Sequence, residues 1–136
     1  MDTGQRYGKA SAYQSVAAWS SATEEDPQRL ILMLYDGALE RIASARGCMN
    51  NGLVGEKTQL ISRALAIVGE LRGTLDLVRG GAIASHLDDL YEYIARRLLE
   101  ANAGNRPELL DEVSSLLREL RSAWGAIAAH PARPPA

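Results

Sequence analysis

The sequence has one cysteine, Cys48, and two histidines, His86 and His130. A single cysteine cannot form a disulfide within the chain, so we expect a reducing compartment and interpret Cys48 as a small buried side chain. A di-iron bundle needs inward glutamates and paired Glu-x-x-His motifs, and no such motif is present. The sequence therefore predicts no metal or other cofactor.

Sequence motifs of catalysis are missing as well. The sequence has no Gly-rich phosphate loop, no Gly-x-Ser-x-Gly elbow and no His-Glu-x-x-His motif. The adjacent carboxylates Asp88 and Asp89 would point in different directions on a helix, which makes them a poor acid–base pair. We therefore expect a protein that is not an enzyme.

The sequence also lacks a large excess of one charge sign, and it has no long apolar run. The formal net charge is −2 and no block of like charge occurs, whereas phosphate binding needs a concentrated basic face, so nucleic acid is not an expected partner. The longest apolar run covers six residues, 30–35, against about 20 for a membrane span. The first residues lack the apolar run of a signal peptide. These features predict a cytoplasmic protein without membrane insertion.

The apolar run lies at the start of the first predicted helix. Asp26 suits the position that caps a helix, and Pro27 suits the first helical position. Apolar residues then recur in steps of three or four, at Leu30, Leu34, Ala38, Ile42, Ala45 and Met49. The turn-forming residues Asn50-Asn51-Gly52 follow. We predict a helix over 27–50 with one buried stripe.

Three more helices are predicted from the same periodicity, at 56–79, 82–103 and 107–129. Gly80-Gly81 is interpreted as the end of the second helix, and Pro107 as the first position of the fourth. Gly69 and Gly73, four residues apart in the second helix, would let another helix or a client backbone approach closely. No alternating strand pattern occurs.

The fold predicted for the whole chain, 1–136, is one all-α domain: an antiparallel up-down four-helix bundle with an N-terminal strap or short helix. The bundle would take 27–129, the N-terminal segment 1–22 and the tail 130–136. Within 10–22, apolar residues lie at loosely helical spacing. This segment either straps the bundle or fills a groove while no partner is bound.

Residues 30–35 are apolar on every side of the helix and must be covered all round. Two interpretations follow. The other helices cover this turn completely, which makes it an ordinary core element. Alternatively, the bundle leaves an apolar groove that another chain fills.

A second class of function depends on His86. Histidine phosphotransfer domains are also four-helix bundles with one exposed histidine, and His86 follows the small residues Ala84 and Ser85. The carboxylates Asp88 and Asp89 would, however, repel a phosphoryl group. A phosphotransfer or general adaptor bundle remains the alternative to a binding chaperone.

Several motifs resemble one known family. Met33-Leu34-Tyr35-Asp36-Gly37-Ala38 resembles the first-helix signature of the flagellin export chaperones, the FliS family. Further matches, in the order of the family, are Ala12-Tyr13-Gln14, Gly80-Gly81-Ala82-Ile83-Ala84, the stretch 90–102, Glu112-Val113, Leu116-Leu117 and Ala123-Trp124. The resemblance covers about residues 7–128.

This resemblance implies a cytoplasmic export chaperone. Such proteins bind the disordered C-terminal region of newly made flagellin, prevent premature polymerisation and support delivery to the flagellar type III export apparatus. The implied partners are flagellin, components of that apparatus and a flagellar regulator. Whether the free protein forms a homodimer through its groove stays open.

The residues expected to contact the client combine the apolar turn with the family motifs. They are Tyr13, Leu30, Met33, Leu34, Tyr35, Gly37, Tyr91, Tyr93 and Arg97. Each has a structural alternative: Tyr13 could pin the N-terminal segment, the apolar residues could pack in the core, and Arg97 could pair with Glu100. Trp124 is interpreted as a core residue.

Overall fold

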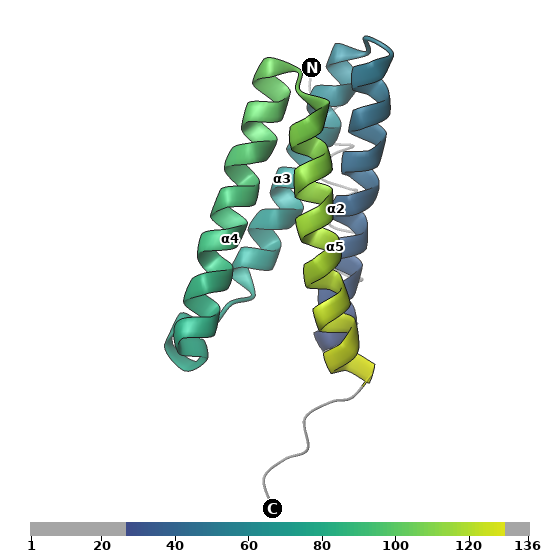
Figure 1. Cartoon of the computed structure of the whole chain (residues 1–136). Coiled ribbons are helices and arrows are strands. Elements are labelled where there is room, and N and C mark those ends of the chain that lie inside the picture. The colour runs from purple at the N-terminus through teal and green to yellow at the C-terminus, as the bar shows by residue number, and fades with distance from the viewer. Residues whose placement is uncertain (1–26, 130–136) are drawn as a thin grey trace, which may run out of the picture.

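A computed structural model describes residues 27–129, and these residues form four helices (Figure 1). In chain order they are α2 (Pro27–Asn50), α3 (Val54–Gly73), α4 (Leu77–Gly104) and α5 (Pro107–Ala129). No strand occurs in this part of the chain, which confirms the all-α prediction. The predicted N-terminal strap and the tail lie outside the described residues. None of the four helices is long and apolar enough to cross a membrane.

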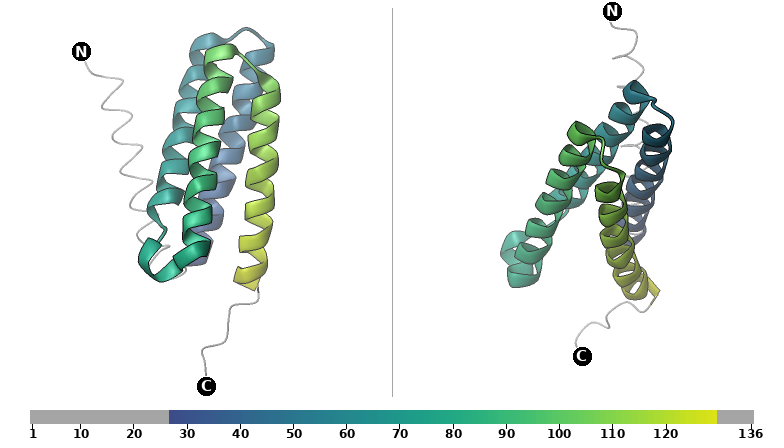
Figure 2. Two further views of the ribbon diagram at one scale, coloured as in Figure 1. Left: turned by 60° about the vertical axis from the view of Figure 1, so that its left-hand side comes forward. Right: turned by 45° about the horizontal axis from the view of Figure 1, so that its top comes forward.

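The four helices form a ring of antiparallel neighbours. Each helix packs against the next one in the chain, and α5 packs back against α2. The backbones of the diagonal pairs, α2 with α4 and α3 with α5, do not approach each other closely. Two further views show the same up-down course (Figure 2). The predicted up-down four-helix bundle is therefore confirmed.

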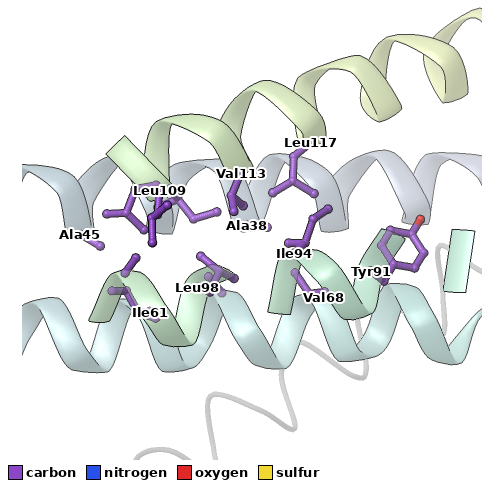
Figure 3. Packing of buried hydrophobic residues seen from close by; sticks show 14 of the residues in the cluster. Ala38, Ala45, Ile61, Val68, Tyr91, Ile94, Leu98, Leu109, Val113 and Leu117 are labelled. Atoms are coloured by element: carbon purple, nitrogen blue, oxygen red, sulfur yellow. The ribbon is translucent and has the colours of Figure 1, made fainter. Parts of the chain in front are cut away.

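The core is built from the inward stripe of each helix. The stripe predicted on α2 is buried along its length, together with Tyr35. It meets apolar residues of the other three helices, among them Ile61, Leu98 and Val113, which are all buried (Figure 3). Small alanines such as Ala38 and Ala45 let the helices approach here, since an alanine adds little between two backbones.

Polar contacts close the end of the bundle that carries the α2–α3 and α4–α5 turns. Lys57, only 4% exposed, donates from Nζ to the backbone oxygen of Asn102 at 3.0 Å and to Oδ1 of Asn105 at 3.2 Å. Thr58 also donates to the Asn102 side chain, at 3.1 Å. These bonds join the beginning of α3 to the last turn of α4, where carbonyl oxygens lack partners within the helix. We call this the closed end.

The predicted boundary between the second and third helices is wrong. α3 ends at Gly73 and not near residue 79, because Thr74 terminates it: the Thr74 amide donates to the Glu70 oxygen at 3.1 Å and its hydroxyl to the Leu71 oxygen at 2.6 Å. α4 then begins at Leu77, before the glycine pair.

The glycine pair bends α4 instead of ending α3. Gly81 has φ 55° and ψ −131°, outside the helical region, so the first turn of α4 is set at an angle to the rest. A Cβ on Gly80 would lie 2.5 Å from the Cβ of Ala84, so only glycine fits there. The bend thus needs both glycines.

Gly69 and Gly73 do not mediate helix packing in the described part of the chain. A Cβ built on either residue would meet no atom within 4 Å. The expectation that a neighbouring helix approaches closely at these glycines is therefore wrong. Close approach of a client backbone there stays a prediction.

The two kinds of glycine should respond oppositely to alanine. Gly81→Ala should lower the free energy of unfolding by about 1–2 kcal/mol, because a Cβ is strained at positive φ. Gly69→Ala, in open space on a helix, should raise it by about 0.5–1 kcal/mol. Urea unfolding of both variants checks this. A stabilising Gly81→Ala would contradict the backbone assignment.

Candidate functional site

The inward apolar side chains of α4 become more exposed toward the start of the helix. Ile83 and Ala101 are eighteen residues apart, which is five helical turns, so they point in the same direction. Ala101 is 0% exposed, yet Ile83 is 75% exposed. Between them, Leu87 and Leu90 are half-buried and Ile94 is buried. Ala84, beside Ile83, stays buried. One edge of the inward face of α4 is therefore core at the closed end and surface at the other.

The stripe of α5 changes in the same way, whereas on α2 only one inward residue of the first turn does. On α5, Val113 and Leu117 are fully buried, whereas the next inward residues, Leu120 and Trp124, are half-buried. On α2, Ile31 shares its direction with buried Met49, eighteen residues on, but is itself half-buried. The loss of cover is a property of this end of the bundle and not of a single helix.

The course of the helices explains this loss. The start of α4 and the end of α5 diverge from each other in all the views of the whole chain (Figures 1 and 2). In the close view, α5 rises away from the core beyond Leu117 (Figure 3). We call this end of the bundle the open end. The open-end surface comprises the apolar side chains Ile31, Ile83, Leu87, Leu90, Leu120 and Trp124.

The open-end surface can bind but offers no catalytic group. Five of its six side chains pack against the buried core from their other side, so the surface is continuous with the interior. Such a surface releases water when an apolar partner covers it, at about 25 cal/mol per Å² of buried apolar area. No group of three His, Cys, Asp or Glu side chains suited to a metal ion occurs between residues 27 and 129.

Two tyrosines lie beneath this surface. The hydroxyl of Tyr35 on α2 and that of Tyr91 on α4 are 2.5 Å apart, and both side chains are buried. Burial raises the pKa of both phenols above its ordinary value, and for Tyr35 the bond to Tyr91 raises it further. The indole of Trp124 acts on both hydroxyls as a hydrogen-bond partner that favours the ionised form. Both phenols stay neutral.

A polar cluster joins α4 and α5 beside these residues. The Tyr93 hydroxyl donates to Oε2 of Glu112 at 2.5 Å, and Nε of Arg97 donates to Oε1 of Glu112 at 2.9 Å. Arg97 also pairs with Glu100 at 3.0 Å, as expected from their spacing, and lies over the Tyr93 ring. The bond from Tyr93, and then Arg97, lower the pKa of Glu112. This cluster ties the two helices together on the closed-end side of the point where they diverge.

Arg–carboxylate pairs with two bonds each connect other neighbours. Their contacts are Arg46 with Asp111 at 2.6 and 3.0 Å, Arg121 with Asp36 at 2.5 and 3.2 Å, and Arg72 with Asp88 at 2.5 and 3.1 Å. The first two join α2 to α5, and the third joins α3 to α4. Arginine holds the pKa of Asp88 and of Asp111 below its usual value. Planar two-bond geometry favours one orientation of each helix pair.

The residues predicted to contact a client do not form one surface. Tyr13 lies outside the described residues. Four of the others are buried in the core, namely Leu30, Leu34, Tyr35 and Tyr91. Met33 is 43% exposed, opposite the inward stripe of α2. Gly37 is half-buried beside Ile67 of α3, and Tyr93 and Arg97 belong to the α4–α5 cluster. Their role in client binding stays a prediction.

The open-end surface escaped the sequence reasoning. The helices contribute Ile83, Leu87, Leu90, Leu120 and Trp124 at the three- and four-residue spacing of inward stripes, and periodicity marks such residues as core. Periodicity cannot tell where along a stripe the neighbouring helix has moved away. The one hint was the apolar turn at 30–35, which suggested incomplete cover near this end.

An all-α bundle whose inner stripes stay exposed at one end is, as a class, a helical scaffold suited to binding another protein chain. The chain itself matches, over residues 9–131, the sequence model of the family described as flagellar protein FliS. It therefore belongs to the FliS family.

Three relatives support this assignment. The chain is 49% identical to flagellar secretion chaperone FliSB of Pseudomonas aeruginosa over 85% of its own length and 91% of that protein. It is 35% identical to flagellar secretion chaperone FliS of Vibrio cholerae, over 88% of each chain. The FliS of Salmonella typhimurium is 38% identical, over 85% of this chain and 87% of that protein. All three are named chaperones and not phosphotransfer proteins or enzymes.

Acid should destabilise the bundle through the paired carboxylates. Since the pKa values of Glu112, Asp88 and Asp111 are lowered on folding, the unfolded chain takes up protons first as the pH falls. Stability should be complete above the ordinary carboxyl range and decrease below about pH 4 as the pH passes through the lowered values. Urea unfolding at a series of pH values measures this dependence.

Glu112→Gln and Arg97→Met should each make this pH dependence shallower. Glutamine removes the titrating group, and methionine removes one of the two partners that stabilise its charged form. If both variants keep the pH dependence of the wild type, the α4–α5 cluster does not contribute as described.

Proposed function

We propose that this protein is a flagellar export chaperone that binds the disordered C-terminal region of newly made flagellin in the cytosol. The observation that carries the proposal is the open-end surface, an apolar face continuous with the core that the helices of the bundle leave half exposed. Family membership and the names of the relatives, secretion chaperones of the flagellum, indicate what kind of chain covers it.

The binding mode proposed is that of a helix or extended segment laid into an apolar face. A client segment with apolar residues at helical spacing could add its own stripe between α4 and α5, where the bundle lacks cover. A disordered client loses conformational freedom on binding, at a cost of about 2–5 kcal/mol or more. The surface extends over three helices, and this large apolar contact would offset that cost.

Binding of this kind accounts for the biological role. The client surface that packs against the chaperone would be the surface that polymerises, so the complex would prevent premature assembly. The protein would then support delivery of flagellin to the flagellar type III export apparatus. Components of that apparatus and a flagellar regulator are proposed as further partners. No catalytic step and no cofactor are needed.

The residues first predicted as contacts fit this proposal in two ways. Leu30, Leu34, Tyr35 and Tyr91 would support the open-end surface from below, since they are buried beneath it. Met33, Gly37, Tyr93 and Arg97 retain exposed atoms and would border the client where it leaves that surface. Tyr13 would contact the client from the N-terminal segment.

Two exposed apolar residues on the same helix allow a matched test. Ile83→Asp places a charge on the open-end surface and should weaken binding of a flagellin C-terminal peptide at least about tenfold, since burying one large aliphatic side chain is worth about 1.5–3 kcal/mol. Leu99→Asp, 56% exposed on the opposite side of α4, should leave affinity unchanged. Isothermal titration calorimetry measures both.

The calorimetric titration tests where the client binds as well as whether flagellin is the client. A one-to-one complex with a negative heat-capacity change is expected for the wild type, because apolar area is buried. Equal losses in both variants would place the client elsewhere on the bundle. If flagellin does not bind the wild type, the proposed function is wrong.

Tyr13→Ala tests the N-terminal segment by the same titration. A phenol contributes apolar area and one hydrogen bond, so its loss should weaken binding by about 0.5–1.5 kcal/mol or more. His86→Ala should leave binding unchanged, because no step of the chaperone role uses that histidine. Unaltered affinity in Tyr13→Ala would confine the client to the long helices.

A further inference from the structure

The two buried tyrosines connect helices that do not otherwise meet. The backbones of α2 and α4 lie on a diagonal of the bundle without close contact. Tyr35 and Tyr91 nevertheless reach each other across the core, hydroxyl to hydroxyl at 2.5 Å. They therefore lie tip to tip and fill the diagonal between the two helices with two of the longest rigid side chains.

Tyr35 and Tyr91 are the largest fully buried side chains in the described part of the chain. Toward the closed end, the same two helices bury a mixture of small and medium residues, among them Ile42, Ala45, Leu98 and Ala101. The tyrosine layer therefore carries the longest side chains on this diagonal, and close packing makes the backbones follow them.

The bond between the two hydroxyls opposes both a decrease and an increase in the separation of α2 and α4. If α2 and α4 moved together, the two hydroxyl oxygens would collide. If they moved apart, two buried hydroxyls would lose their partners, which is costly in an apolar surrounding. Phenylalanines would fill nearly the same volume without this constraint. A polar pair in an otherwise apolar core thus favours one distance between α2 and α4.

The pair is also linked to the open-end surface. Leu87, Leu90 and Trp124 of that surface pack against the buried cluster that contains both tyrosines. The pair therefore lies in the part of the core that supports the apolar face. Any change in the length of the pair would move the side chains that form the face.

We propose that Tyr35 and Tyr91 form a strut that sets the separation of α2 and α4 at the open end, and so act as positioning residues for client binding. The claim about client binding rests on the proposed function, and the claim about helix separation does not. Without the strut, the open-end surface would exist in several arrangements, and the client would bind only the fraction with the right width.

The test compares separation, affinity and stability in Tyr35→Phe/Tyr91→Phe. Spin labels on Met33→Cys of α2 and His86→Cys of α4, in a Cys48→Ala background, report the separation of these two helices at the open end by pulsed electron resonance. Both labelled positions are exposed. We expect a narrow distance distribution in the parent and a broader or shorter one in the double variant. Tyr93→Phe removes a hydroxyl that bonds α4 to α5, where Arg97 still holds Glu112, and should leave the α2–α4 distribution unchanged.

Affinity for the flagellin C-terminal peptide separates positioning from mere stability. If the competent width is populated about a tenth of the time, apparent affinity should fall about tenfold. The urea midpoint should fall little, since both rings remain in the core. An unchanged distance distribution overturns the strut, and so does a loss of affinity that follows a matching loss of stability.

The experiment distinguishes a failure of the proposed function from a failure of the proposed strut. If the parent protein does not bind flagellin, the proposed function fails, while the distance comparison still decides the strut. If the double variant does not fold, the single variants Tyr35→Phe and Tyr91→Phe replace it, because each already breaks the hydroxyl bond.

Discussion

Complete burial of four apolar stripes requires that four helices stay side by side along their whole length. In this protein they do so only at the closed end, where Lys57 joins α3 to the end of α4 and where alanines allow close packing. Toward the other end, α4 and α5 diverge, and residues of the same stripes become half exposed. The divergence of two helices thus turns a core into a surface without any change in the sequence pattern.

Charged residues orient the helices of the bundle relative to one another. The arginines of the described pairs and the Arg97 cluster bridge neighbouring helices at the flanks of the core. Exposed pairs of this kind contribute little to stability, yet their planar geometry favours one alignment. The charges engaged in them are also unavailable for long-range attraction of a partner. The proposed function therefore relies on the apolar face.

Membership in the FliS family gives that face a biological context. A chaperone of a secreted filament protein needs to cover an apolar stripe of its client without altering it chemically. A bundle with one uncovered end suits this task, because a client stripe can complete the packing that the bundle itself leaves unfinished. The glycine bend at the start of α4 shapes the same end, since it sets the first turn of α4 at an angle to the rest.

Much of the fold could be predicted from local signals. Pro27 and the Asn50-Asn51-Gly52 turn defined α2, and its stripe from Leu30 to Met49 is buried as expected. The α3–α4 junction was misplaced, because Gly80-Gly81 is the stronger turn signal in the sequence, although Thr74 ends α3 through its own hydrogen bonds. Tyr35 and Tyr91 were picked out as contacts, and their pairing could not be foreseen from residues so far apart in the chain.

The sequence by itself determined the four helices, their inward faces and the family, since these depend on spacing and on motifs that are local in the chain. Only the tertiary structure decided which parts of each stripe are covered. Ile83 and Ala101 have the same helical direction, and one is surface while the other is core, because exposure depends on how far away the neighbouring helix lies. That distance results from packing among all four helices and is encoded in no single one.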